Sequence, residues 1–288
     1  MKNLELQYLL EGLDVDVSGH WSTWGFNKFP INSYEFAKLE EYRDRVVLAY
    51  YLYNLIGLEH ARRLLANAPK DARILDAGGG TGRKAIPLAL DGFTNIDVVD
   101  LAPAWLDLAK EKAAVAGVED ALSFNEGNIL SLENIEDSTY DFVISLGGPV
   151  SYCGSPDQAL VTLTRVLVPG GRLLADGIHG KLGYMRGTAT SGQLKELERL
   201  LGYEEDRKRS LTDCPGLFPE ELEEMAQKAG LSEIKVGSEF GFIPKDDILV
   251  GDDLERWCKA VIDLEMTFVQ DPRFLGASGL VLRGRKAI

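Results

Sequence analysis

The chain has 288 residues, of which 45% are hydrophobic and 26% charged, a composition typical of a globular protein that buries a substantial core. Its 45 acidic and 31 basic residues give a formal net charge of −14 at pH 7. This charge disfavours DNA or RNA as a substrate, because binding to the phosphate backbone requires clustered Lys and Arg. Neutral or cationic small molecules fit such a field better.

The three cysteines and three histidines argue against a structural zinc site. Cys153, Cys214 and Cys258 lie far apart and form no C-x-x-C pair, and the acidic residues show no recognisable metal spacing. We therefore expect no bound metal, reduced thiols and a cytoplasmic protein. Residues 1–16 contain acids and no uninterrupted apolar stretch, so no signal peptide is expected, and no apolar run is long enough to cross a bilayer.

Residues 1–70 form an N-terminal region of their own. Aromatic residues crowd positions 21–29, and from Ser33 to about Leu65 apolar residues recur at three- and four-residue steps, which predicts a long helix. We expect this helix to act as a lid. The aromatic segment either walls an acceptor site with flat apolar surface or straps the N-terminus onto the core.

Residues 71–288 form the main domain, in which strands alternate with helices. Such alternation predicts a seven-stranded, mostly parallel sheet with helices on both faces. After His179 the alternation breaks, and residues 181–216 are expected to be an inserted cap. The expected strands are 73–77, 95–99, 121–125, 140–145, 171–175, 231–240 and 278–285, and the expected helices are 81–90, 103–116, 156–167, 219–229 and 253–269.

A glycine-rich loop follows the first expected strand, where residues 73–86 read RILDAGGGTGRKAI. Glycines let backbone approach a ligand that a Cβ would exclude, and amides at the start of a helix face an anionic or polar group. Residues 80–85 satisfy the dinucleotide pattern G-x-G-x-x-A, whereas residues 76–82 satisfy D-x-G-x-G-x-G, the S-adenosylmethionine loop. The glycines alone do not separate the two patterns.

Two acidic residues add to the loop. Asp100 ends the second expected strand, where a carboxylate accepts hydrogen bonds from both ribose hydroxyls or caps the following helix. Asp76 precedes the first glycine of the second pattern. A carboxylate there attracts the sulfonium and ammonium of S-adenosylmethionine but repels a pyrophosphate, so its charge favours the methionine-containing cofactor.

The chain resembles the class I S-adenosylmethionine-dependent methyltransferases that modify small molecules, a family with a Rossmann-like fold. The resemblance covers about residues 40–180 and rests on five segments in order, which are ILDAGGGTGRKAIPLA, VVDLAPAWLDLAKEKA, SFNEGNILSL, YDFVISLGGPVSY and RVLVPGGRLLADG. It implies S-adenosylmethionine as cofactor and S-adenosylhomocysteine as product.

The resemblance also implies roles for individual residues. The methionine portion of the cofactor would lie among Asp76, Gly78, Gly80, Thr81 and Gly82. Asp100 would hold the ribose, Leu101 and Ile129 would contact the adenine, and Leu146 would supply backbone near the ammonium group. Asn128 stands where the family often has Asp, and its amide oxygen can still accept a hydrogen bond from the adenine amino group. Arg43 would contact the methionine carboxylate, or it belongs with Arg45 to a solvated helix face.

Few residues suit proton transfer from an acceptor. His179 follows the fifth strand, at the edge of the sheet where ligands bind in open α/β folds, and serves as a general base or as a turn residue. Tyr152 follows the fourth strand and is expected to orient the acceptor, with Asp176 as a rival base. His60 is expected on the surface of the long helix.

These features predict a methyltransferase that acts on a small molecule, with oxygen or nitrogen as the favoured acceptor atom and with neither nucleic acid nor membrane as partner. Two alternatives stay open. An NAD-dependent oxidoreductase fits the glycines but not the charge of Asp76. A non-catalytic protein that binds S-adenosylmethionine would carry the same loop.

Overall fold

The computed structural model describes residues 45–180, 216–239, 254–271 and 279–288. Outside the described residues lie residues 1–44, which include Arg43, and residues 181–215 of the expected cap. The helices and strands are α2 (Arg45–Leu64), β1 (Ile74–Ala77), α3 (Ala85–Leu90), β2 (Ile96–Asp100), α4 (Pro103–Ala116), η5 (Glu119–Ala121), β3 (Leu122–Glu126), β4 (Tyr140–Ser145), α5 (Pro149–Tyr152), α6 (Pro156–Val166), β5 (Leu167–His179), α9 (Pro219–Lys228), β6 (Leu231–Glu239), α10 (Leu254–Phe268) and β7 (Gly279–Lys286).

The seven strands follow the order β3-β2-β1-β4-β5-β7-β6. β1, β2 and β3 are parallel to one another, β4 is parallel to β5, and β7 is antiparallel to both β5 and β6. The expected seven-stranded, mostly parallel sheet of a Rossmann-like fold is therefore confirmed. The chain divides into two compact units, residues 1–128 with 242–264 and residues 129–241 with 265–288.

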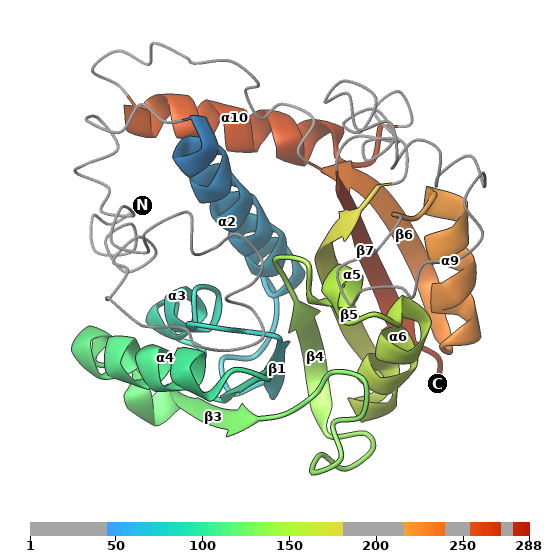
Figure 1. Ribbon diagram of the computed structural model, residues 1–288, viewed down its shortest axis with the longest axis horizontal. Helices are drawn as coiled ribbons and strands as arrows, with labels where there is room; N and C mark the ends of the chain where they lie inside the picture. Colours follow the sequence, from blue (N-terminus) through green and yellow to red (C-terminus); the bar gives the residue numbers. More distant parts are fainter. Residues whose placement is uncertain (1–44, 181–215, 240–253, 272–278) are drawn as a thin grey trace, which may run out of the picture. The chain divides into compact units, whose positions relative to one another are not determined.

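In the first unit, β1 is an apolar strand with every residue buried, as expected of a parallel strand covered on both faces. Helices α3 and α4 pack beside β2 and β3 (Figure 1). Helix α4 begins with Pro103 in its first turn and ends at Gly117, whose φ of 67° closes the helix in the left-handed region. These signals were readable from the sequence, and α4 has its predicted bounds.

Helix α3 begins later than predicted, at Ala85 and not at Thr81. Gly80 and Gly82 have φ values of 53° and 74°, which a right-handed helix cannot include. The loop between β1 and α3 is therefore longer than predicted and consists of turns. The prediction that its backbone amides stand at the start of a helix does not hold for all of them.

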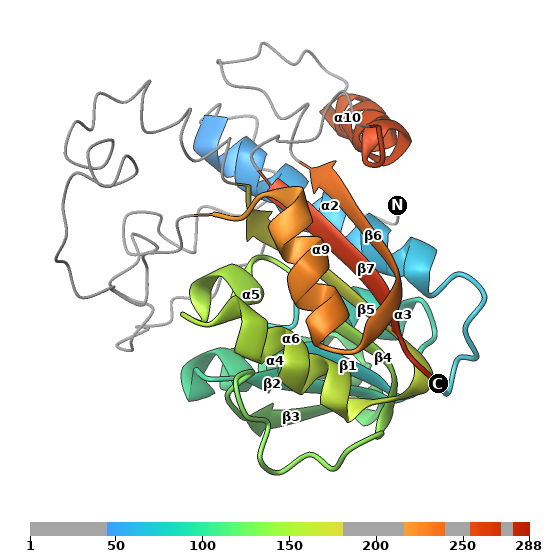
Figure 2. The same cartoon turned by 90° about the vertical axis from the view of Figure 1, so that its right-hand side faces the viewer.

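In the second unit, α9 packs along β6, and α6 lies beside α9 (Figure 2). Strand β5 is much longer than the predicted strand at residues 171–175, since it runs from Leu167 to His179. Its register against β4 shifts between Tyr140, paired with Leu167, and Phe142, paired with Arg172. Gly170, with φ of 78°, accommodates this bulge, so the strand includes residues that lie before the predicted start at Gly171.

The prediction for His60 was wrong, because this side chain is fully buried within α2. Its neighbours Leu58 and Ala61 are buried as well, as are Leu52 and Ile56 one to two turns earlier. These buried positions lie around most of the circumference of α2. The spacing of apolar residues in the sequence had indicated a narrower buried face.

We expect Gly177→Ala to lower the free energy of unfolding more than Gly117→Ala does. Both glycines have similar positive φ values, 63° and 67°. A Cβ on Gly177 would lie 2.6 Å from the backbone nitrogen of Gly148, whereas a Cβ on Gly117 would meet no atom within 4 Å. Left-handed strain alone costs about 1 kcal/mol, and the clash should add roughly 1–3 kcal/mol. Urea denaturation of both variants checks this, and equal losses would contradict it.

Candidate functional site

The glycine loop lies at the carboxyl end of β1, beside the end of β2. The backbone N–H groups of Gly78 and Gly79 donate to the carbonyl oxygen of Val99 at 2.7 and 3.2 Å. Gly78, Gly80 and Gly82 all have positive φ values, so the glycines of the predicted pattern are required by backbone conformation. In open parallel sheets this edge is where ligands bind.

Gly79 is required for a different reason, which the sequence pattern missed because it treats this position as variable. A Cβ on Gly79 would lie 2.7 Å from Cγ1 of Val98 and 2.8 Å from Cγ of Asp76. The loop thus packs directly on β2 and on the Asp76 side chain. The run of three consecutive glycines in the sequence could have indicated this close packing.

Asp100 fastens the loop to the end of β2. One carboxylate oxygen, Oδ2, accepts a hydrogen bond from the Gly80 N–H at 2.8 Å, and Oδ1 accepts one from the Ala102 N–H at 2.9 Å. Burial raises the pKa of this carboxyl group, and the backbone donors Ala102, Gly80 and Leu101 oppose that shift. The sequence also allowed Asp100 to cap α4. The N-cap residue of α4 is Ala102 instead, and Asp100 contacts the start of this helix by accepting from the Ala102 N–H.

Trp105 completes the surroundings of Gly80 and was missed by sequence reasoning. A Cβ on Gly80 would lie 3.1 Å from Cε3 of Trp105 and 3.8 Å from Oδ2 of Asp100. The indole and the carboxylate therefore flank the same glycine. The position of Trp105, in the first turn of the helix that follows Asp100, could have indicated this contact.

The polar atoms of the loop fit a nucleoside-bearing cofactor. Asp76 is fully buried, and the buried Thr81 hydroxyl has no hydrogen-bond partner among the described residues. A buried hydroxyl without a partner is costly unless a ligand or water satisfies it. The glycines leave a stretch of backbone without Cβ atoms beside it, so Thr81, Asp100 and the loop amides are suited to hold such a molecule.

Lys84, at the end of the loop, is buried and ties it to helix α2. Its ammonium group donates to the carbonyl oxygen of Asn54 at 2.7 Å and to the Asn54 side-chain oxygen at 3.2 Å. A buried ammonium needs such acceptors. The loop is thus anchored by Asp100 at one point and by Lys84 at another.

Other predicted cofactor residues lie at the ends of neighbouring strands. Leu101 and Asn128 are exposed; Leu101 directly follows β2, and Asn128 lies two residues after the end of β3. The Gly127 N–H donates to the Asp100 carbonyl oxygen at 3.0 Å, which keeps the residue before Asn128 close to the ribose-binding candidate. Ile129 and Leu146 belong to the second unit and are buried there.

In the second unit, the turn after β4 packs on the end of β5. The Gly147 N–H donates to Oδ1 of Asp176 at 2.5 Å, and the Gly177 N–H donates to Glu239. Asp176 and Glu239 are 2% and 1% exposed. Asp176 thus serves as a hydrogen-bond acceptor within the turn. Glu239 was missed by sequence reasoning, because only the pairing of β6 with β7 brings it to this edge of the sheet.

The two predicted catalytic residues both belong to this part of the second unit. Tyr152 ends the short helix α5, which was not predicted, and a Cβ on Gly148 would lie 2.7 Å from its ring. His179 is the last residue of β5 and pairs with Gly279 of β7. The imidazole of His179 lies outside the described part of the structure.

Among the described residues, no group of three or more His, Cys, Asp or Glu side chains is arranged to hold a metal ion. No helix in the same part of the chain is long and apolar enough to cross a membrane.

Comparison with known proteins identifies the family. Residues 74–171 match the model of the methyltransferase domain. The ubiquinone/menaquinone biosynthesis C-methyltransferase UbiE of Zymomonas mobilis is 30% identical over 169 residues, which cover 56% of this chain and 68% of that protein. The tRNA 5-carboxymethoxyuridine methyltransferase of Escherichia coli is 33% identical over 123 residues, but the match covers only 42% of this chain and 46% of that relative.

Solved structures support the fold. A phosphoethanolamine N-methyltransferase of Haemonchus contortus, in complex with S-adenosylhomocysteine and phosphomonomethylethanolamine, aligns with a TM-score of 0.51 at 20% identity, over 80% of this chain and 53% of that one. A methyltransferase of Thermotoga maritima aligns with a TM-score of 0.50 at 20% identity, over 87% and 97% of the two chains.

The chain therefore belongs to the class I S-adenosylmethionine-dependent methyltransferases. S-adenosylmethionine is the cofactor of this family, which confirms the predicted family and cofactor. The family favours the D-x-G-x-G-x-G interpretation of the loop over the dinucleotide interpretation. The roles assigned to individual residues stay predictions.

We expect Asp100→Ala to weaken binding of S-adenosylhomocysteine by roughly 10- to 100-fold, because it removes a charge-assisted contact of about 1.5–3 kcal/mol. Isothermal titration calorimetry measures this. Asp107→Ala is the control, since Asp107 is an exposed residue on α4 whose partner is Lys110. Affinity unchanged in Asp100→Ala would remove Asp100 from the cofactor site.

Burial raises the pKa of Asp100, and with the ribose role predicted for this residue we expect cofactor affinity to depend on pH. The neutral carboxyl group favours the folded protein below the ordinary Asp pKa of 3.8, and that contribution is lost as pH rises through the raised value. Because we predict that the Asp100 carboxylate binds the ribose, S-adenosylhomocysteine affinity should rise over the same interval. Calorimetry across acidic pH should show this rise in the native protein and a flatter profile in Asp100→Asn. The same rise in both proteins would assign it to another group.

Proposed function

We propose that the protein transfers a methyl group from S-adenosylmethionine to a small-molecule acceptor, with oxygen or nitrogen as the favoured acceptor atom. The observation that carries the small-molecule assignment is the net charge of −14, with 45 acidic against 31 basic residues. A surface of this sign repels the phosphates of tRNA or DNA. A cytoplasmic location stays a prediction.

The cofactor, when bound, supplies an already activated methyl group on a sulfonium. The protein then has to align acceptor and cofactor and to exclude water. We assign Asp76 to the cationic portion of the cofactor, since its buried carboxylate has the required charge. Asp100 holds the ribose, Leu101, Asn128 and Ile129 surround the adenine, and Arg43 contacts the methionine carboxylate.

We assign the acceptor side to Tyr152 and His179. The Tyr152 ring packs on Gly148, in a turn that Asp176 holds through the Gly147 N–H. This packing supports a fixed phenol that orients an acceptor hydroxyl or amine. His179 would take the proton that such an acceptor loses.

The proposal is tested by offering the full chain S-adenosylmethionine labelled in its methyl group, together with either a small-molecule extract or a bulk tRNA pool. Label transferred to the extract supports the proposal. Label transferred to tRNA would overturn the small-molecule assignment in favour of tRNA methylation, the activity for which the Escherichia coli relative is named. Cofactor binding with no transfer to either pool would favour a non-catalytic binding protein.

With the labelled acceptor in hand, we expect His179→Gln to lower kcat by about 100-fold or more, the usual contribution of a general base. Affinity for S-adenosylhomocysteine should change by less than about twofold, because the imidazole is assigned to the acceptor and not to the cofactor. Unchanged turnover would leave His179 with a structural role only. Tyr152→Phe should instead raise KM for the acceptor more than it lowers kcat.

A further inference from the structure

The segment that follows β3, residues 129–139, contains no helix or strand, yet its backbone conformation is tightly specified. Leu132 and Ser138 have φ values of 45° and 57°, which residues with a Cβ rarely adopt. Such conformations persist only where the surrounding structure holds them in place. The segment must therefore have strong anchors.

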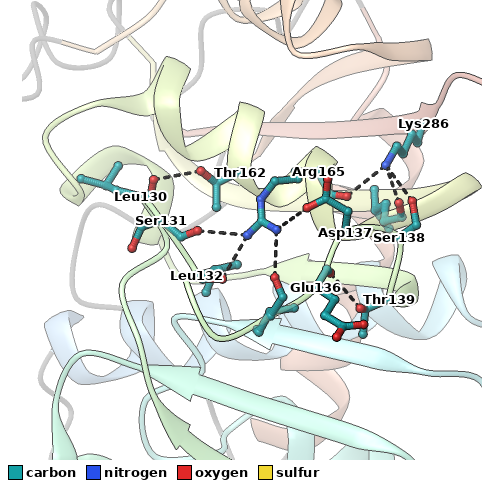
Figure 3. Close-up of polar contacts among 12 residues, drawn as sticks. Leu130, Ser131, Leu132, Glu136, Asp137, Ser138, Thr139, Thr162, Arg165 and Lys286 are labelled. Atoms are coloured by element: carbon teal, nitrogen blue, oxygen red, sulfur yellow. Dashed lines mark hydrogen bonds and ion pairs between the residues drawn. The ribbon is translucent and has the colours of Figure 1, made fainter.

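Arg165, in the last turn of α6, supplies the main anchor (Figure 3). Its Nη1 donates to the carbonyl oxygen of Ile135 at 2.8 Å, and its Nη2 donates to the carbonyl oxygens of Ser131 and Leu132, both at 3.0 Å. Nη1 also contacts Oδ1 of Asp137 at 2.6 Å. A planar guanidinium directs several donors at once, which a lysine ammonium cannot reproduce in this arrangement.

Neighbouring contacts hold the two ends of the segment. At its start, the Thr162 hydroxyl donates to the carbonyl oxygen of Leu130 at 2.9 Å. At its end, the Ser138 N–H donates to the Arg165 carbonyl oxygen at 3.1 Å, and Lys286 donates to the same oxygen at 3.0 Å (Figure 3). The anchors thus act directly at the strained residues and beside them.

The start of this segment is joined to predicted cofactor residues. Asp100 pairs with Glu126 at the ends of β2 and β3, and the Gly127 N–H donates to the Asp100 carbonyl oxygen. Asn128 comes next, and Ile129 begins the anchored segment. Since Asp100 is assigned to the ribose, the chain that leaves β3 at the same edge is suited to meet the base.

We propose that Arg165 is a positioning residue for the purine end of S-adenosylmethionine. By holding the carbonyl groups of residues 131, 132 and 135, it determines the path of the chain from Ile129 onward, and it acts on Asn128 through the peptide bond that joins the two residues. The proposal rests on the adenine-side roles assigned to Asn128 and Ile129, and it does not depend on the methyl acceptor.

A double-mutant cycle tests the proposal. Arg165→Lys, Asn128→Ala and the double variant of the full chain are titrated with S-adenosylhomocysteine by calorimetry, with thermal unfolding measured in parallel. Arg165→Lys should raise Kd about tenfold in the native background but about twofold or less in the Asn128→Ala background, because residues that act through one contact are not additive. A residue with a general structural role would lower affinity equally in both backgrounds, and that result would overturn the proposal.

Two controls separate the carbonyl contacts from charge. Asp137→Asn removes the ion pair but keeps the three carbonyl contacts, and Arg285→Lys alters an arginine of the same unit that contacts Gly170 and Glu233 instead. Both should change Kd by less than about twofold, since exposed ion pairs contribute little. A loss in Asp137→Asn as large as that in Arg165→Lys would overturn the proposal.

If Arg165→Lys fails to fold, Thr162→Val decides the question, since it removes the contact to Leu130 together with the hydrogen bond that the Thr162 hydroxyl accepts from the Gln158 side chain at 3.2 Å. It should raise Kd about threefold in the native background and leave it unchanged in the Asn128→Ala background. Unchanged affinity in Asn128→Ala alone would overturn the proposal by removing the adenine-side role. The acceptor assay would be unaffected by that outcome, so failure here is distinguishable from failure of the proposed function.

Discussion

The hydrogen bond from the Gly80 N–H to the Asp100 carboxylate is the interaction on which the cofactor loop depends. It joins the loop after β1 to the end of β2, at a glycine whose φ of 53° other residues rarely adopt and whose added Cβ would lie 3.1 Å from Cε3 of Trp105. The same carboxylate also accepts from Ala102, at the start of α4. One buried acidic group therefore holds a loop, a strand end and a helix start together, and it keeps lone pairs with which a ribose can bond.

Burial of acidic groups recurs at the edge of the sheet. Asp100, Asp176 and Glu239 are all buried near the carboxyl ends of β2, β5 and β6, and each accepts from the N–H of a glycine. Burying a carboxylate costs free energy unless donors satisfy it. Backbone amides are suitable donors because they carry no charge that could compete with a ligand. In each unit, a buried acidic side chain thus holds a glycine turn at the end of a strand.

Positioning in this fold depends on groups that are distant in sequence from the residues they hold. Arg165 donates to carbonyl groups 30 or more residues earlier in the chain, and Lys286 reaches an oxygen of Arg165 from the last strand. Neither side chain carries reactive chemistry. Their importance lies in specifying one conformation for a segment that contains strained residues and no regular hydrogen-bond pattern.

The fold class and the glycine loop could be predicted from local patterns, namely the alternation of strand and helix periods, the D-x-G-x-G-x-G spacing and the charge of Asp76. The family followed from the resemblance of five segments in order. Helix α4 and strand β4 even have their predicted bounds, since Pro103, Gly117 and the apolar run at residues 140–145 are local signals. The bulge in β5, the burial of His60 and the contacts of Gly79, Trp105, Glu239 and Arg165 are visible only in the folded chain. These depend on strand register and on contacts between residues far apart in the chain, which no local pattern encodes.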